Sequence, residues 1–543
     1  MNKKRNKGGR GAKAASLKKR NKKAVKVKRP SRKKLIKNAD EKKKAPEKEM
    51  PATTPLKERE EERRREALVE AKVSGESLLE KAGEEKRRAI EELVKRVSSR
   101  VTPSQKEEVE EKDFASNLIR RLAAKLGEGV RINFVGSAAR DTGLKGDRDI
   151  DLFVAYPKNF PRVEIIKKTF NATKKAIRAN WILRYAEHPY LQARINKFKV
   201  EVIPCFQIEP HEEIRSAVDR SPLHMDYLQK HLTEEQRRDV RVLKQFLKNA
   251  DIYGAEAEVE GFSGLVCEYL MLNYRSFQGV VENAAEWKPP EVIDIEGVYE
   301  DWPRGKVLEK FGNAPLILID VIDKNRNTTA AVCECNAAKF ISLCRAFLEK
   351  PSEKFFFRKK EPIKKEAVLS AMAEKNHYFL LMEITKPDVI EDILFPQLRK
   401  TAGVVARQFE LNEFKVFEYS YFVTEKHAFI LVELEGGELP PTKKLIGPPV
   451  SDPEAVKRFL KAHKRVIRGP WLEGARVAIE EKRILCNARE LVGQMKHEPM
   501  RFGVASHFKK AFKRAKIGGG KGILNGETLQ GVGSHVLRKE FWW

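Results

Sequence analysis

The chain has 543 residues, 41% of them hydrophobic, and its formal net charge is +30 at pH 7. This length predicts about three or four domains with substantial apolar cores. The charge points to a polyanionic partner, for which nucleic acid is the simplest candidate. No apolar run is long enough to predict a membrane-spanning helix, and the basic N-terminus lacks the apolar stretch of a secretory signal.

The first 39 residues contain 18 Lys or Arg and no Asp or Glu. Such a segment buries too little apolar surface to offset the entropy lost on ordering. Prolines between residues 46 and 55 extend it, so we expect a disordered basic arm over residues 1–55. Residues 56–97 are charged with apolar residues at helical spacing, although Gly75 and Gly83 weaken the pattern. We expect a charged helical spacer there.

Residues 98–222 alternate predicted helices with predicted strands. Helices are expected at residues 105–126 and around residues 163–179. Four strands are expected, and together with these helices they predict a small mixed sheet flanked by helices. The expected strands are residues 131–135, 150–156, 184–185 and 198–206.

The first two of these strands flank a Gly-Ser turn and an Asp-x-Asp pair. Asp149 and Asp151 lie two apart on a strand and therefore point to the same face. Two carboxylates on one face repel each other unless a cation lies between them, and oxygen ligands suit Mg²⁺. Gly136 allows close backbone approach to a ligand, Ser137 can donate to a phosphate, and Arg140 adds a charge-assisted donor. Together, these residue types are suited to metal-assisted nucleotidyl transfer.

An Asp-x-Asp pair by itself is most often a solvated strand edge, but the upstream Gly-Ser turn between apolar strands favours a site. Glu201 is the only acid in the strand at residues 198–206. On position alone, Glu201 is equally compatible with a third metal ligand and with the surface of an amphipathic strand.

Residues 223–350 are expected to be mostly helical, with helices at residues 224–250, 264–282 and 337–350. Residues 351–543 alternate helices with short strands, for example at residues 378–384 and 428–433. Two later basic runs, residues 461–468 and 507–516, are equally compatible with RNA contact and with solvated helix faces.

Six cysteines are scattered along the chain, which is typical of reduced core residues in a cytoplasmic protein. Cys333 and Cys335 are the only close pair, and no second pair or histidine cluster accompanies them. We therefore assign no metal to this pair.

The Gly-Ser turn, the Asp-x-Asp pair and a later carboxylate resemble the nucleotidyltransferase superfamily that includes DNA polymerase beta. Further motifs follow in order: YAEHPY at 185–190, VEVIPC at 200–205, AVDRSPLH at 217–224, LKQFLK at 243–248, IYGAE at 252–256, GFSG at 261–264, DKNRN at 323–327, KPD at 386–388, FPQL at 395–398 and GPP at 447–449. Each motif alone is weak, but the ordered set is specific. The set resembles the archaeal, class I CCA-adding tRNA nucleotidyltransferases over roughly residues 88–543.

This resemblance implies an α+β multidomain protein. Residues 98–222 would form a polymerase-beta-like nucleotidyltransferase catalytic domain with a small mixed sheet, and residues 223–350 a helical nucleotide-binding middle domain. Residues 351–543 would form α+β body and tail domains that bind the acceptor stem and 3′ end of tRNA. The implied reaction is template-independent addition of C, C and A to tRNA from CTP and ATP, with release of pyrophosphate.

The resemblance also implies roles for individual residues. Asp149, Asp151 and Glu201 would hold two Mg²⁺ ions, and Arg326 would read the base edge through its guanidinium fork. Each of the remaining residues also has an ordinary structural explanation, such as a helix-start histidine, a surface lysine or a packed ring. The implied nucleotide-binding residues are Gly136, Ser137, Arg140, Ser221, His224, Lys244, Tyr253 and Arg326.

Two positions depart from the family pattern. Glu201 stands where Asp is usual, which puts the efficiency of the third ligand in question but not the class of reaction. Residues 320–323 read DVID where DPVD is expected, a change at a turn.

Two other functions stay open at this point: a related transferase of poly(A)-polymerase type, and a non-catalytic basic RNA-binding scaffold. A homodimer is also left open. The retention of Ser137, Arg140, Asp149, Asp151 and Lys244 argues against the scaffold, and the ordered downstream motifs argue against the related transferase.

The basic arm generates a prediction about RNA affinity. Deleting residues 1–85 is expected to weaken RNA binding, and most strongly at low salt, because phosphate contacts release counterions and so make the affinity salt-dependent. The catalytic rate at saturating tRNA is expected to stay largely unchanged. Filter binding at several salt concentrations should give a steeper fall of log affinity with log salt for the full chain. Equal slopes would show that the arm does not contact RNA.

Overall fold

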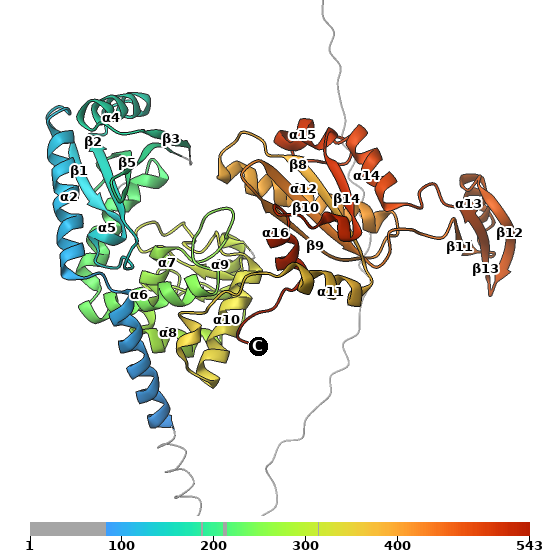
Figure 1. Ribbon diagram of the computed structural model, residues 1–543, viewed down its shortest axis with the longest axis horizontal. Helices are drawn as coiled ribbons and strands as arrows, with labels where there is room; N and C mark the ends of the chain where they lie inside the picture. The colour runs from blue at the N-terminus through green and yellow to red at the C-terminus, as the bar shows by residue number, and fades with distance from the viewer. Residues whose placement is uncertain (1–82, 186–187, 210–213, 313) are drawn as a thin grey trace, which may run out of the picture. The chain divides into compact units, whose positions relative to one another are not determined.

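The computed structural model describes residues 83–543 apart from residues 186–187, 210–213 and 313 (Figure 1). The predicted basic arm and most of the predicted spacer lie outside the described residues. Within the described part, no helix combines the length and apolar character needed to cross a membrane.

The described chain begins with a helix over residues 83–101. Its Ile90, Leu93 and Val97 side chains are at most 3% exposed and pack in one core with residues of α6 (Glu234–Asn249). This part of the predicted spacer therefore supplies apolar side chains to a core, while its Glu and Lys side chains remain exposed.

Helix α2 (Gln105–Ala123) leads into the first sheet. It begins with a capping box, in which Glu107 N–H donates to Ser104 Oγ and Ser104 N–H donates to Glu107 Oε2. The five strands of the sheet lie in the order β1-β2-β5-β4-β3. They are β1 (Arg131–Val135), β2 (Asp149–Tyr156), β3 (Ile182–Tyr185), β4 (Pro189–Ile195) and β5 (Phe198–Phe206).

The sheet is mixed, because β2 and β5 pair in parallel while the other neighbours are antiparallel. Alternate side chains of β2 and β5, such as Ile150, Leu152 and Val202, pack with α2 and α4 (Arg162–Ala176) in one core. The opposite face carries the polar side chains at the start of these two strands and, further along them, a second apolar cluster that includes Phe153 and Ile203.

All four predicted strands are present, but the sequence analysis missed β4. This strand starts at Pro189 and mixes polar with apolar residues, so its alternation is weak. It returns into β5 through a tight turn in which Asn196 adopts a left-handed φ of 54°, a conformation that asparagine tolerates.

The next region is mainly helical and contains a two-stranded parallel sheet, β6-β7. The predicted helix at residues 224–250 is wrong as a continuous element, because a capping box at Thr233 starts α6 as a new helix. The predicted helix at residues 264–282 is likewise interrupted, at Arg275, whose φ is 71°. The elements are α5 (Arg220–His231), α7 (Gly264–Tyr274), α8 (Phe277–Ala285), β6 (Glu291–Ile293), α9 (Arg304–Phe311), β7 (Leu316–Leu318) and α10 (Glu334–Glu349).

The C-terminal part contains two further sheets. The first has the order β14-β8-β10-β9; one of its faces packs against α12 (Glu391–Leu411), and the other buries a separate apolar cluster. The second is the three-stranded sheet β11-β13-β12. The predicted strands at residues 378–384 and 428–433 correspond to β8 and β10. The strands are β8 (Tyr378–Thr385), β9 (Val416–Val423), β10 (His427–Leu434), β11 (Thr442–Pro449), β12 (Val466–Glu473), β13 (Arg476–Lys482) and β14 (Lys516–Gly519). The predicted α+β multidomain class is confirmed.

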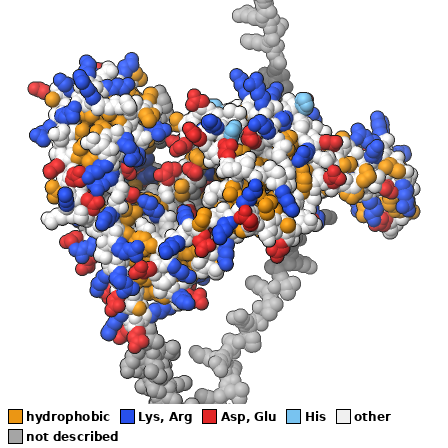
Figure 2. Space-filling model, in the orientation of Figure 1, with side chains coloured by type: hydrophobic (Ala, Val, Ile, Leu, Met, Phe, Trp, Pro, Cys, Tyr) orange, Lys and Arg blue, Asp and Glu red, His pale blue; other side chains and the backbone are white. Residues whose placement is uncertain are grey.

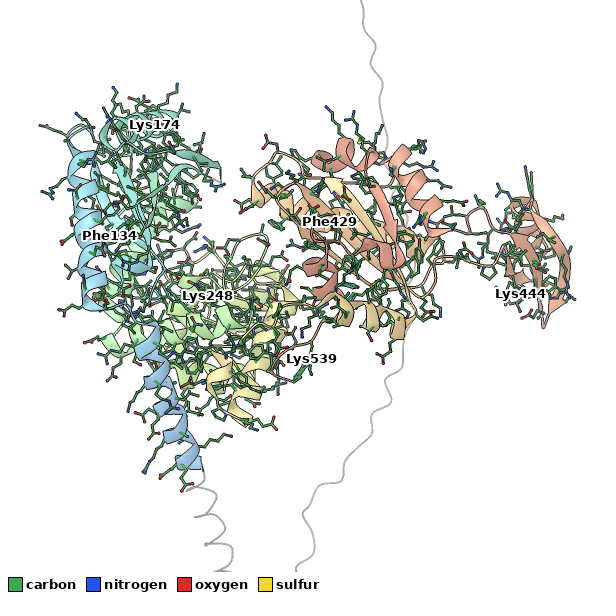
Figure 3. All side chains as sticks on the ribbon, viewed as in Figure 1. Phe134, Lys174, Lys248, Phe429, Lys444 and Lys539 are labelled. Carbon is green, nitrogen blue, oxygen red and sulfur yellow. The ribbon has the colours of Figure 1, made fainter. Side chains whose placement is uncertain are left out.

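The remaining helices of this part are α11 (Lys365–Lys375), α13 (Pro453–Ala462), α14 (Ala488–His497), α15 (Lys509–Lys513) and α16 (Leu529–Val536). The last residues of the chain reach the helical region, where Trp542 Nε1 donates to Ser342 Oγ of α10 at 2.8 Å. The labelled Lys444 and Phe429 in Figure 3 locate the three-stranded and four-stranded sheets.

Candidate active site

Three predicted carboxylates share one face of the first sheet. Asp149 and Asp151 lie on β2, and the parallel register places Asp151 directly opposite Glu201 on β5. Their sequence neighbours Ile150 and Val200 are fully buried on the other face, against the helices. Period-two alternation on two adjacent strands therefore brings all three acids to the same side.

The electrostatics of this face disfavour three bare negative charges. Burial, together with the carboxylates of Glu201 and Asp149, raises the pKa of Asp151 to about 7. Burial also raises the pKa of Asp149, against the opposing effect of Lys199. Because a nearby cation would reverse these shifts, the site favours a positively charged occupant.

The donor set suits Mg²⁺, which prefers carboxylate oxygens. The three acids share a face without forming a ready-made coordination shell, because among residues 83–543, outside the gaps, no three Asp, Glu, His or Cys side chains are grouped as an ion would require. Metal binding would therefore require these side chains to rotate toward a common point.

Gly136 fits this site because of its conformation and its size. Its φ is 87°, in the region that favours glycine. A Cβ at this position would collide with the Asp151 carboxylate. The predicted Gly-Ser turn is the start of the short helix α3 (Gly136–Ala139), and Thr142 N–H donates to the Ser137 carbonyl at 2.9 Å.

Arg140 directs its guanidinium toward a buried acid that the sequence analysis did not identify. Its Nε donates to Glu268 Oε1 of α7 at 3.0 Å, and the Thr142 hydroxyl donates to the same oxygen. Glu268 is fully buried. Burial opposes its ionisation, but the charges of Arg140 and Lys244 and these hydrogen bonds outweigh burial and hold the pKa of Glu268 below its usual value.

Helix α6 fixes the loop that carries the chain from α3 to β2. Arg241 Nε donates to the Gly143 carbonyl at 3.0 Å, and Lys244 Nζ donates to the Thr142 carbonyl at 2.8 Å. One turn later, Lys248, labelled in Figure 3, pairs with Asp147 at 3.1 Å. Lys244 is almost completely buried, and burial lowers its pKa. Through its hydrogen bond to the Thr142 carbonyl, Lys244 stabilises the loop at the edge of the predicted site.

His224 and Arg326 meet at a second buried acid, Asp320. His224 Nε2 lies 2.8 Å from Asp320 Oδ1, and Arg326 Nη1 donates to Asp320 Oδ2 at 2.6 Å. Burial opposes ionisation of Asp320, but His224, the Ile322 N–H and Arg326 hold its pKa well below the usual range. Tyr269 of α7 donates to the same acid at 3.3 Å.

The remaining predicted residues lie next to these groups. Ser221 is half-buried one turn before His224 on α5. A Cβ added to Gly264 would lie 3.4 Å from the Tyr253 hydroxyl and 3.5 Å from Lys244 Nζ, so both side chains border the start of α7. Because Glu268 and Tyr269 are adjacent on α7, this helix links the Arg140–Lys244 group to the His224–Arg326 group.

Two predicted motifs line a common hollow of about 1260 Å³. Arg220 belongs to the motif at residues 217–224, and Asp323 and Lys324 belong to the motif at residues 323–327. Arg220 Nη1 pairs with Asp323 Oδ2 at 2.7 Å and so ties the two motifs together. The hollow is large enough for a nucleotide, but its lining includes neighbours of the predicted nucleotide-binding residues rather than those residues themselves.

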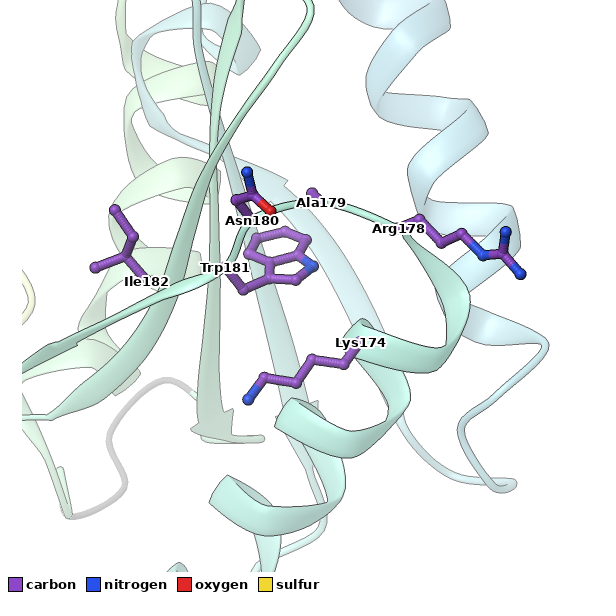
Figure 4. Close-up of a pocket in the computed structure, with 6 residues that line it drawn as sticks. All are labelled: Lys174, Arg178, Ala179, Asn180, Trp181 and Ile182. Atoms are coloured by element: carbon purple, nitrogen blue, oxygen red, sulfur yellow. The ribbon is translucent and has the colours of Figure 1, made fainter.

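Another hollow, of about 840 Å³, lies at the end of α4 and contains none of the predicted site residues (Figure 4). Lys174 and Arg178 line this hollow near the C-terminus of α4, where the helix dipole favours cations. Trp181 Nε1 donates to the Ile177 carbonyl at 3.0 Å, which fixes the indole ring as a cap on that helix end.

The sequence analysis missed four residues in contact with the predicted site: Lys199, Glu268, Asp320 and Gln192, whose Nε2 donates to Glu201 Oε1 at 2.7 Å. Lys199 could have been found, because it lies two residues before Glu201 on the same strand face. Gln192 depends on the missed strand β4. Glu268 and Asp320 come from distant parts of the chain, and no spacing rule connects them to Arg140 or His224.

Comparison with known proteins gives matches along the chain in order. A family model described as a nucleotidyltransferase domain matches residues 115–224, one described as the second domain of tRNA nucleotidyltransferase matches residues 238–357, and one described as the C-terminal domain of the CCA-adding enzyme matches residues 375–516. The similar relatives include three CCA-adding enzymes. That of Methanothermobacter thermautotrophicus is 34% identical over 72% of this chain and 85% of the relative. The enzyme of Methanopyrus kandleri is 34% identical over 81% of this chain and 93% of the relative. The enzyme of Methanocaldococcus jannaschii is 35% identical over 69% of this chain and 85% of the relative.

The buried Glu268 generates a stability prediction. Glu268→Gln leaves the Arg140 and Lys244 cations without their counter-charge, so unfolding should become easier by about 3–5 kcal/mol at pH 7. Urea unfolding followed by circular dichroism measures this change. Glu286→Gln, which alters an exposed acid after α8, should stay within about 0.5 kcal/mol of the parent. Equal effects of the two substitutions would contradict the assigned network.

Proposed function

The chain belongs to the family of CCA-adding enzymes, and we propose that it adds C, C and A to the 3′ end of tRNA from CTP and ATP, without a template and with release of pyrophosphate. The observation that carries this proposal is the row of Asp149, Asp151 and Glu201 across β2 and β5, beside the glycine at position 136. These residues give the chain a site whose carboxylates and close backbone approach suit the reaction of the CCA-adding enzymes to which it is similar.

In the proposed reaction, the RNA 3′-oxygen attacks the α-phosphorus of the nucleotide, and the bond to pyrophosphate breaks. Asp149, Asp151 and Glu201 would hold two Mg²⁺ ions, which would lower the pKa of the 3′-hydroxyl and offset negative charge on the phosphates. Glu201 would also accept the hydroxyl proton, because its carboxylate lies on the same face as the proposed ions. The chain contributes mainly positioning and preorganised charge.

The nucleotide would be held by residues from the helices α3, α5 and α6 and from the loops that carry Tyr253 and Arg326. Gly136 and Ser137 would bring backbone and hydroxyl groups close to the triphosphate, and Arg140, oriented by Glu268, would present its terminal nitrogens to it. Lys244 and Tyr253 border the same region. Because His224 and Arg326 share Asp320, Arg326 would be held in one orientation for reading a base edge. Ser221 lies one turn before His224 on α5.

The tRNA would be bound mainly through its phosphates. Lys and Arg side chains are spread over many elements on the face drawn in Figure 2 rather than gathered in one patch, and this suits contact with an extended duplex backbone. The two predicted basic runs lie at the end of α13 with the start of β12, and over α15 with the start of β14. We propose both as RNA contacts.

Nucleotide choice on a defined RNA tests this function against the two alternatives. The substrate is tRNA ending before CCA, incubated with Mg²⁺ and each nucleoside triphosphate alone and in pairs. CTP alone should extend the RNA by two residues, and CTP with ATP by three. A run of A residues would favour the poly(A)-type transferase, and no incorporation would favour a non-catalytic scaffold.

The shared face of Asp149 and Asp151 generates the first activity prediction. Asp149→Ala or Asp151→Ala should abolish nucleotide addition in the extension assay, because each removes a carboxylate from the proposed metal site. Filter binding should show nearly unchanged tRNA affinity, because neither acid is proposed to contact RNA phosphate. Turnover like that of the parent in either variant would refute the active-site assignment.

The unusual third carboxylate generates a separate prediction. Glu201→Gln should lose most activity, because the amide lacks the negative charge that two cations require, whereas Glu201→Asp should retain much of it. Single-turnover rates at saturating Mg²⁺ and nucleotide measure both. If the Gln variant is as active as the parent, another residue serves as the third ligand.

A further inference from the structure

Lys199 brings a positive charge into the face that carries the three acids. It lies two residues before Glu201 on β5 and directly opposite Asp149 on β2, so its side chain points to the same side of the sheet. Its Nζ lies 3.0 Å from Glu201 Oε1 and 3.8 Å from Asp149 Oδ1. The ammonium group therefore links two of the three proposed metal ligands.

Glu201 is also held from the neighbouring strand β4. Gln192 Nε2 donates to Glu201 Oε1 at 2.7 Å, and Arg184 Nε of β3 donates to Gln192 Oε1 at 3.0 Å. These contacts set the direction of the Gln192 amide and fix one oxygen of Glu201. Within the described part of the chain, Glu201 Oε2 accepts no hydrogen bond from the protein, so it is the oxygen available to a metal ion.

We propose that Lys199 is a resident cation of the active site, which neutralises the acidic face before metal binds and competes with the divalent ion for Asp149 and Glu201. This inference rests on the proposed function, because it assumes that the acids bind metal. Lys199 lies between Asp149 and Glu201 in the structure and contacts both. A metal ion that binds Asp149 and Glu201 meets carboxylates that the ammonium group already contacts and partly neutralises.

The extra methylene of glutamate at position 201 fits this arrangement. Glu201 reaches both Lys199 and Gln192 with one oxygen and keeps the other for a metal. When Lys199 withdraws, Gln192 still holds Oε1, supported by Arg184. Lys199 therefore sets how readily metal enters, while Gln192 and Arg184 preserve the orientation of the ligand.

The test measures metal affinity directly. Mn²⁺ binding to the full chain without nucleotide is followed by electron paramagnetic resonance, which counts free Mn²⁺. Lys199→Met should bind Mn²⁺ on the order of tenfold more tightly, the size expected from removing one unit charge at ion-pair distance on a partly exposed surface. Thermal unfolding should show a larger rise of Tm with Mn²⁺ for this variant than for the parent.

Lys197→Met is the matched control, because it removes the same charge two residues earlier, where Lys197 pairs with Glu110. Its Mn²⁺ affinity should match that of the parent. Lys199→Arg keeps the charge and should also remain close to the parent. Lys199→Gln serves as the second neutral variant if the Met variant does not fold.

The outcomes separate this inference from the proposed function. Equal or weaker Mn²⁺ binding by the neutral Lys199 variants, together with loss of binding in Asp151→Asn, overturns the role of Lys199 and keeps the metal site. Absence of saturable Mn²⁺ binding by the parent chain overturns both. Tighter binding in Lys199→Met, with unchanged binding in Lys197→Met, supports the resident cation.

Discussion

Three carboxylates on one face of two parallel strands are the constraint around which the described catalytic region is arranged. Asp149, Asp151 and Glu201 repel one another where solvent screening is reduced, and burial together with this repulsion raises the pKa of Asp151. Three features fit this constraint. The opposite face of the strands buries their apolar neighbours against α2 and α4, which fixes the direction of the acids. Gly136 lacks the Cβ that would displace Asp151. Lys199 supplies a cation within ion-pair distance.

A second pair of acids organises the residues proposed to bind the nucleotide. Glu268 and Asp320 are completely buried, and each carries more than one positively charged or donor group: Arg140 with Thr142 and Lys244 nearby, and Arg326 with His224. A long basic side chain loses rotamer freedom when it binds a phosphate. A buried acid that already holds the side chain in one rotamer reduces the entropy that remains to be lost on binding. The structural and binding explanations of Arg140 and Arg326 are therefore compatible, because the acid engages one part of each guanidinium and leaves other donors for a ligand.

The resemblance to class I CCA-adding enzymes, inferred from ordered motifs, is confirmed by the relatives that match most of the chain. Period-two alternation was sufficient to predict β1, β2 and β5 and the common face of Asp149 and Asp151. It was insufficient for β4, whose alternation is weak, and for the breaks at Thr233 and Arg275, where capping and a left-handed residue override an otherwise helical pattern. The assigned roles of the site residues stay predictions. Contacts such as Arg140–Glu268 join residues 128 positions apart, and only the tertiary fold determines them.

The charge distribution poses a problem for an enzyme that acts on RNA. A chain of net charge +30 attracts the phosphate backbone, yet the proposed reaction centre is a local concentration of negative charge. An RNA end and a triphosphate are both anionic, so neither can approach bare carboxylates without a favourable counter-charge. Lys199 offsets part of that repulsion but carries only one charge and occupies the ligands themselves. In the proposed reaction, divalent ions would supply more charge in the same space and would replace Lys199 as the counter-charge of these acids. The metal would then be needed for the approach of anionic substrates as well as for chemistry, because it would offset the charge of the acidic face.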